Sequence, residues 1–140
     1  MAIRTPYLAT DCVIECFDEA GDFLGIVLIE RKNPPHGVAL PGGFVEVGET
    51  VEAANVREMR EETGLEVKLE HLLGVYSDPD RDPRFHTVSV VYTGRAVGRP
   101  HGGDDARSAA LYHLSEIPWE KLAFDHERIL KDFISYKERC

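Results

Sequence analysis

The alternation of hydrophobic and polar residues predicts a chain that consists mainly of strands. Residues 10–17 and 23–30 are β-like runs, and the polar segment 18–22 between them is typical of a hairpin turn. Residues 33–37 contain consecutive prolines, which cannot donate to a β-ladder, so this segment is expected to be a loop. The pattern predicts five further strands, with a break at Pro41-Gly42-Gly43 between the first two: 38–40, 44–47, 65–75, 85–97 and 108–113.

Two other segments have the pattern of helices. In residues 50–63, Thr50 can cap the first turn, Glu52 suits the positive N-terminal end and Gly64 suits the stop. Residues 125–136 carry apolar side chains at helical spacing, which predicts a helix packed on the core. Strands that outnumber the two helices covering them predict an α/β sandwich around a mixed β-sheet.

The composition fits a single domain over residues 1–140, because 43% of the residues are hydrophobic and can form a core. No apolar run approaches the roughly 20 residues of a membrane span. The first ten residues lack the basic and apolar regions of a secretory signal, so a cytoplasmic protein without a membrane partner is expected.

The cysteines and histidines give no sign of a disulfide scaffold or a zinc site. The three cysteines include no CxxC pair, and Cys12 and Cys16 are expected to act as small apolar residues in a strand. The histidines show no metal-ligand spacing, and most of the five at His36, His71, His101, His113 and His126 are expected to be exposed.

The formal net charge of −9 argues against a nucleic-acid polymer as partner, because such binding needs clustered lysine and arginine. The acidic excess is concentrated in one short segment with six glutamates: Glu49, Glu52, Glu58, Glu61, Glu62 and Glu66. A phosphate substrate could approach this segment only if cations lay between protein and ligand.

Three of these glutamates share one face of the predicted helix. With Glu58 at zero on a helical wheel, Glu61 falls at about −60° and Glu62 at about +40°. Like charges at this spacing cost a few tenths of a kcal/mol each, which favours a bound cation. Mg²⁺ prefers such oxygen ligands and bridges carboxylates to phosphates. The alternative is a solvated acidic face with Arg57 and Arg60 as counter-charges.

The sequence around this face has a specific pattern. Gly43 is followed after five residues by Glu49, and after seven more by Arg57-Glu58-Met59-x-Glu61-Glu62-x-Gly64-Leu65, with Leu40-Pro41-Gly42 just before it. This segment resembles the Nudix box at every defined position. The resemblance implies a Nudix-type α/β/α sandwich and metal-dependent hydrolysis of a diphosphate linkage in a nucleoside diphosphate derivative.

The resemblance also implies a metal site. Glu58 and Glu62 would be the main ligands, Glu61 a ligand or the base that acts on water, and the carbonyl of Gly42 or Gly43 would complete the shell. Mg²⁺ is the expected cofactor, with Mn²⁺ as a substitute. Family members differ in which carboxylate acts as base, so the base is left open here.

Two more residues of the box are implied to act together. Glu49 and Arg57 would pair to hold the loop against the helix, although Glu49 also reaches the metal in some family members. The expected catalytic set is therefore Glu61, Glu58, Arg57 and Glu49.

Residues 74–86 are expected to recognise the group that is linked to the diphosphate of the substrate. This segment resembles a branch of the family that acts on ADP-ribose, in which proline is frequent at the position of Pro79 and glycine at that of Phe85. Arg81, Arg84 and His86 could donate to a terminal phosphate or ribose. The alternative is an ordered surface loop whose arginines pair with its aspartates, Asp78, Asp80 and Asp82.

An adenine base would need an aromatic platform, for which Phe44, Tyr7 and Tyr76 are candidates, although each could equally be packing. In residues 102–106, Asp104 or Asp105 could replace an acid that relatives carry at the position of Ser108, but a simple turn is an equal alternative.

The sequence thus predicts Mg²⁺-dependent attack of water on ADP-ribose, giving AMP and ribose 5-phosphate. One alternative is a pyrophosphohydrolase of nucleoside triphosphates or their oxidised forms. Another is a catalytically silent module that binds a nucleotide and regulates a partner. A homodimer and a monomer both fit the sequence.

Overall fold

The computed structural model describes residues 2–101 and 106–140. Its strands are β1 (Tyr7–Phe17), β2 (Phe23–Arg31), β3 (Val38–Ala39), β4 (Gly42–Phe44), β5 (Lys68–Tyr76), β6 (Thr87–Val97) and β7 (Ala106–Tyr112). Its helices are α1 (Val51–Thr63) and α2 (His126–Arg139), with short 3-10 helices at Leu114–Glu116 and Trp119–Lys121.

The strands form one mixed sheet. Its order is β3-β2-β1-β6-β5, while β4 also pairs with β1 and β7 with β2. The central pair β1 and β6 is parallel, in a register that runs from Tyr7↔Thr87 to Phe17↔Val97. The other pairs are antiparallel. The structure confirms the mixed sheet expected from the sequence.

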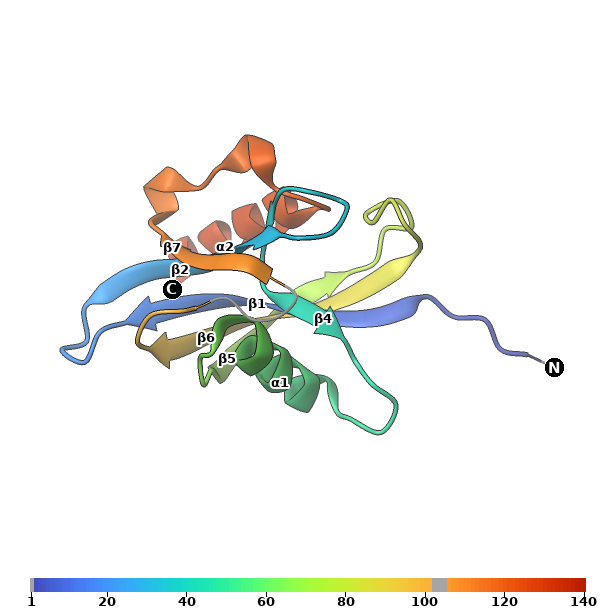
Figure 1. Ribbon diagram of the computed structural model, residues 1–140, viewed down its shortest axis with the longest axis horizontal. Coiled ribbons are helices and arrows are strands. Elements are labelled where there is room, and N and C mark those ends of the chain that lie inside the picture. The colour runs from blue at the N-terminus through green and yellow to red at the C-terminus, as the bar shows by residue number, and fades with distance from the viewer. Residues whose placement is uncertain (1, 102–105) are drawn as a thin grey trace.

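The two α-helices cover opposite faces of the sheet (Figure 1). Because neighbouring residues of a strand point to opposite faces, β1 contributes to both sides. Its Val13 packs in a core cluster with Phe133 of α2. Its Cys12 and Cys16 pack in a second cluster with Met59 of α1.

The cysteines of β1 are buried, as the sequence predicts. Burial raises the pKa of the Cys16 thiol to about 11 and raises that of Cys12 further. Both side chains therefore act as small apolar core residues.

The helix that carries the acidic face has the caps that the sequence predicts. The Thr50 hydroxyl accepts a hydrogen bond from the Ala53 backbone N–H at 3.1 Å. Gly64 ends the helix at φ 73°, a left-handed conformation that glycine adopts without strain.

The predicted break at Pro41-Gly42-Gly43 is wrong for the two glycines, which already belong to β4. Gly42 and Gly43 pair with Asp11 and Thr10 of β1. A Cβ on Gly42 would overlap the Thr10 carbonyl oxygen and the Asp11 carboxylate. Glycine therefore allows β1 and β4 to approach closely here, and it does not interrupt a strand.

Several boundaries shift by a few residues. β5 begins at Lys68 rather than at residue 65, β6 begins at Thr87 rather than at 85, and α2 extends to Arg139. In the described ranges, no helix combines the length and the apolar character needed to cross a membrane.

Candidate active site

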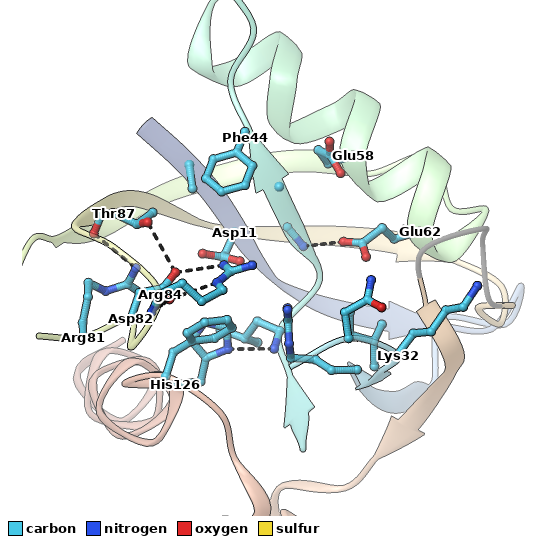
Figure 2. A pocket seen from close by; sticks show the side chains of 18 residues that line it. Asp11, Lys32, Phe44, Glu58, Glu62, Arg81, Asp82, Arg84, Thr87 and His126 are labelled. Atoms are coloured by element: carbon cyan, nitrogen blue, oxygen red, sulfur yellow. Dashed lines mark hydrogen bonds and ion pairs between the residues drawn. The ribbon is translucent and has the colours of Figure 1, made fainter. Parts of the chain in front are cut away.

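A cavity of about 270 Å³ opens between the sheet, α1 and the loop before β6. Figure 2 shows Glu58 and Glu62 on one side of it and Arg81, Asp82 and Arg84 on another. Its charged lining residues are Asp11, Glu58, Glu62 and Asp82 among the acids, and Arg31, Lys32, Arg81 and Arg84 among the bases. We call the side with Glu58 and Glu62 the acidic wall and the side with Arg81 and Arg84, where Asp82 also lies, the basic wall.

The acidic wall is built where α1 meets β4. Glu62 is buried, and its Oε1 accepts a hydrogen bond from the Gly42 backbone N–H at 2.7 Å. Glu58 lies so close to Gly43 that a Cβ there would overlap its carboxylate. The structure thus brings together Gly42, Gly43, Glu58 and Glu62, four residues that the sequence assigns to the metal site.

Arg57 forms ion pairs with three acidic residues of the motif. Its Nε and Nη2 donate to the two carboxylate oxygens of Glu49 at 2.9 and 2.7 Å. Its Nη1 donates to Glu58 Oε1 at 2.8 Å and to Glu61 Oε1 at 2.9 Å, and its Nη2 to the Phe44 carbonyl at 3.1 Å. One guanidinium therefore ties the loop before α1 to the helix.

The Arg57 contacts change the acidity of Glu49. The hydrogen bond from Arg57, with a second one from the Glu46 backbone, lowers the pKa of Glu49 to about 2. The hydrogen bonds to Glu49, Glu58 and Glu61 raise the pKa of the Arg57 guanidinium. The pair therefore stays ionised at every pH at which an enzyme would be assayed.

Glu61 is placed differently from its two neighbours. Its side chain is 53% exposed, and it does not line the cavity. Among the residues that the structure describes, no three acidic, histidine or cysteine side chains already converge on one point. Glu58 and Glu62 are the carboxylates of the motif that face the cavity.

Asp11 is a member of the acidic wall that sequence reasoning missed. It is buried in β1, accepts a hydrogen bond from the Ser89 hydroxyl and lines the cavity. Asn55 of α1 donates to the Thr10 hydroxyl at 2.8 Å and to the Asp11 carbonyl at 2.9 Å. The signal was the Thr10-Asp11 pair within a mostly apolar strand, since buried strands seldom carry a charge without a partner.

The two arginines of the loop before β6 are not equivalent. Arg81 is buried and donates to both carboxylate oxygens of Asp125 at 2.7 and 3.0 Å, which fixes the loop to the start of α2. Arg84 donates to Asp82 at 2.9 and 3.0 Å. The pairing expected for an ordered loop is thus present for Arg84, whereas the partner of Arg81 lies outside the loop.

The other residues expected to bind substrate differ in whether they line the cavity. Phe44 lines the cavity and packs against Tyr7 and Phe85, with ring centroids 5.9 and 6.2 Å apart. Pro79 and His86 do not line the cavity, and His86 Nε2 bonds to the Ser77 carbonyl at 3.0 Å. Tyr76 is buried against α2, so the structure places it away from any nucleotide platform. Asp104 and Asp105 lie outside the described residues.

His126 is an exception to the expectation that most of the histidines are exposed. It lies at the first position of α2, it is 2% exposed, and its Nδ1 accepts a hydrogen bond from the Leu40 backbone N–H at 3.0 Å. Its ring lines the cavity floor, between the start of α2 and the end of β3. Arg31 and Phe124 also line the cavity without having been expected to.

Residues 6–133 match the NUDIX domain. The chain belongs to the Nudix family. The family and the fold suggested by the sequence motif are thereby confirmed.

Three relatives show how far the similarity extends. An ADP-ribose pyrophosphatase of Methanocaldococcus jannaschii is 51% identical over 135 residues, which cover 94% of this chain and 75% of the relative. The ADPR responsive transcriptional repressor NtrR of Acinetobacter baylyi is 33% identical over 91% of this chain and 52% of its own length. A MutT/nudix family protein from Enterococcus faecalis has a TM-score of 0.79 and 32% identity, over 94% of this chain and 62% of that one. This Nudix chain thus spans three quarters of the first relative and about half of the second.

Arg57→Lys is expected to lower kcat of this Nudix protein by about 10–100-fold, as losing a group that orients metal ligands does. A lysine ammonium cannot hold Glu49, Glu58 and Glu61 in one fork. Steady-state kinetics would measure the loss, with Arg60→Lys as the matched control, because Arg60 pairs with Glu66 at the exposed end of the same helix. Equal kcat values for Arg57→Lys and the wild type would show that the carboxylates need no such tether.

The stability of the protein is expected to depend on pH through His126. Burial lowers the pKa of His126 below its ordinary value of 6.5; Asp11 and Asp125 act against this shift, while Arg81 and Arg31 add to it. The unfolded chain therefore binds more protons than the folded one just below pH 6.5, so stability falls as the pH drops through that range.

His126→Gln removes this titration while the amide oxygen can still accept from the Leu40 N–H. Urea unfolding at pH 7.5 and 5.5 should show a smaller difference between the two pH values for this variant than for the wild type. His36→Gln, at an exposed position, is the control. An unchanged pH difference in His126→Gln would contradict the buried neutral imidazole.

Proposed function

We propose that the chain hydrolyses the diphosphate linkage of ADP-ribose with Mg²⁺ as cofactor, giving AMP and ribose 5-phosphate. The observation that carries this proposal is the cavity in which Glu58 and Glu62 face a wall of arginines. A diphosphate bridging two such walls would meet a cation site on one side and guanidinium groups on the other. The 51% identity to an ADP-ribose pyrophosphatase supports the choice of substrate.

The residues present fit a hard divalent cation. Glu58 and Glu62 supply carboxylate oxygens from successive turns of α1, and the backbone of Gly42 and Gly43 lies directly against them. We propose these residues as the Mg²⁺ site, in which Mn²⁺ could substitute. A cation held there would polarise a phosphoryl oxygen and promote the ionisation of water.

The chain's own groups are proposed to orient the reactants. Arg57 fixes the Glu58 carboxylate and the Gly42 N–H fixes that of Glu62, so neither has to be ordered when substrate binds. Water then attacks one phosphorus, the bridging P–O bond breaks, and the leaving phosphate takes the electron pair. A carboxylate of the motif accepts the proton of the water.

Glu61 has two candidate roles, cation ligand or base, and Glu61→Gln separates them. Loss of a base lowers kcat at every Mg²⁺ concentration, by about 10²–10⁴-fold. Loss of a ligand instead raises the Mg²⁺ concentration needed for half-maximal rate and leaves the saturated rate closer to normal. A Mg²⁺ titration of kcat distinguishes the two, and a variant that matches the wild type in both quantities would exclude both roles.

The substrate proposal is tested by comparing kcat/KM across ADP-ribose, other nucleoside diphosphate sugars, dinucleoside polyphosphates and nucleoside triphosphates. ADP-ribose is expected to give the highest value. Faster release of pyrophosphate from a nucleoside triphosphate would overturn ADP-ribose as the substrate. No hydrolysis of any compound would favour a regulatory nucleotide-binding module. The presence of Glu58, Glu61 and Glu62 argues against such a module, because catalytically silent members generally lack carboxylates of this motif.

A further inference from the structure

One buried side chain of α1 joins the helix to the central strand of the sheet. Asn55 is 0% exposed, and its Nδ2 donates to the Thr10 hydroxyl at 2.8 Å and to the Asp11 carbonyl at 2.9 Å. Both acceptors belong to β1. Two hydrogen bonds from one amide therefore fix where this turn of α1 lies on the sheet.

The same two residues of β1 pair with the strand that carries the glycines of the proposed cation site. Thr10 pairs with Gly43, and Asp11 pairs with Gly42. The Thr10 hydroxyl donates in turn to the Val90 carbonyl of β6 at 2.7 Å. The residues that accept from the amide are thus held by β4 along one edge of β1 and by β6 along the other, so they give α1 a fixed point of attachment.

Asn55 lies on the same face of α1 as the two proposed ligands. Glu58 and Glu62 follow it by three and seven residues, and this spacing places the three side chains on one stripe of the helix. The Glu58 carboxylate lies against Gly43, and the Gly42 N–H donates to Glu62. The position of this stripe on β1 therefore sets how the two carboxylates lie relative to the backbone of β4.

Electrostatic repulsion acts against this arrangement. The Asp11 carboxylate lines the same cavity as Glu58 and Glu62, and like charges that share a cavity repel one another. The Asn55 amide is uncharged, so it can hold α1 on β1 without adding to this repulsion.

The contact is poorly suited to a purely stabilising role. Within residues 2–101 and 106–140, Asn55 Oδ1 has no hydrogen-bond partner. A buried acceptor that is left unpaired costs more free energy than one hydrogen bond gains, which offsets much of what the two donated bonds contribute. The main effect of the side chain is therefore on where α1 lies.

We propose that Asn55 is a positioning residue of the cation site: its two hydrogen bonds to β1 keep the Glu58 and Glu62 carboxylates beside the backbone of β4 before a cation binds. This role rests on the proposed function for the site itself. A site that must first be assembled binds its ligand more weakly, in proportion to the fraction of molecules that are competent. Asn55 therefore acts on the affinity for the cation and much less on the rate once the cation is bound.

Binding of Mn²⁺ to Asn55→Leu, measured by electron paramagnetic resonance without substrate, tests this role. Leucine has nearly the shape of asparagine, but it cannot donate to β1, and the substitution also removes the unpaired oxygen. The Kd for Mn²⁺ should rise by about 10–100-fold, the usual effect of removing a group that orients metal ligands. The melting temperature of the metal-free protein should change little, and kcat at saturating Mg²⁺ should be close to that of the wild type.

The matched control is Tyr92→Phe. The Tyr92 hydroxyl makes another hydrogen bond between the sheet and α1, to Glu52 at 3.0 Å, but at an exposed position outside the cavity. Its loss should leave the Kd for Mn²⁺ unchanged.

Thr10→Val breaks the contact from the strand side and provides a second variant in case Asn55→Leu disturbs folding. It should also raise the Kd for Mn²⁺. The double variant should bind Mn²⁺ about as weakly as Asn55→Leu alone, because both substitutions remove one shared interaction.

An unchanged Kd in Asn55→Leu, an equal increase in Tyr92→Phe, additive effects in the double variant, or a kcat that stays low at saturating Mg²⁺ would each overturn the role of Asn55. Glu58→Gln separates this inference from the proposed site. Weaker Mn²⁺ binding in Glu58→Gln but not in Asn55→Leu would retain the cation site and refute the positioning role. Wild-type affinity in Glu58→Gln would refute the proposed site and, with it, the role of Asn55.

Discussion

Glu58→Gln and Glu62→Gln are each expected to lower kcat by about 10²–10⁴-fold, because a bound cation contributes several kcal/mol to such a reaction and each 1.4 kcal/mol is tenfold. Both carboxylates face the cavity from α1. Glutamine keeps the size of the side chain and can still accept the 2.7 Å hydrogen bond from the Gly42 N–H at position 62. The loss should therefore appear in kcat and in Mg²⁺ affinity, with little change in stability.

The matched control is Glu52→Gln on the same helix, where the side chain accepts a hydrogen bond from the Tyr92 hydroxyl at 3.0 Å and lies outside the cavity. Rates, Mg²⁺ binding and melting temperature would be measured for all three variants. Full activity in both Glu58→Gln and Glu62→Gln would remove these residues from the cation site.

Alanine at the two glycines of β4 is expected to change two different quantities: the free energy of unfolding at position 42 and kcat at position 43. In Gly42→Ala the new Cβ would overlap the Thr10 backbone carbonyl, so β1 and β4 must separate, at a cost of about 1–3 kcal/mol in the free energy of unfolding. In Gly43→Ala the new Cβ meets only the end of the Glu58 side chain among its three nearest atoms. That side chain can move, so we expect a folded protein with a displaced carboxylate and a kcat at least about tenfold lower.

Urea unfolding and steady-state kinetics distinguish the two outcomes. Gly74→Ala is the control, because a Cβ there meets Tyr76 ring atoms at no less than 3.5 Å, an ordinary contact. Wild-type stability in Gly42→Ala, or wild-type kcat in Gly43→Ala, would contradict the close packing of β4 against β1 and α1.

The part of the site that could be predicted from the sequence is the part that is local in the chain. Thr50, the glutamates of α1 and Gly64 lie within one helix and its caps, so helical spacing alone places Glu58 and Glu62 on one side. Arg57 reaches Glu61 four residues later on the same helix. The family pattern adds Gly42 and Gly43, which the sheet then brings against that helix.

The part that could not be predicted depends on contacts between distant segments. Arg31 ends β2, Phe124 precedes α2 and Arg84 precedes β6, and no periodicity in the sequence relates them. The partner of Arg81 is likewise Asp125, far along the chain, rather than an aspartate of its own loop. The strand at Gly42 was missed for a related reason, because glycine weakens a strand locally and is required here by the neighbouring strand.

Hydrolysis of ADP-ribose in ¹⁸O-labelled water, with Mg²⁺ and in parallel with excess chelator, tests the central claim most directly. The account predicts AMP and ribose 5-phosphate, one of them with a single ¹⁸O on its phosphate, and no reaction with chelator. Label in a sugar hydroxyl, release of adenine, or an equal rate in the presence of chelator would contradict attack of water on phosphorus at a cation site formed by Glu58 and Glu62.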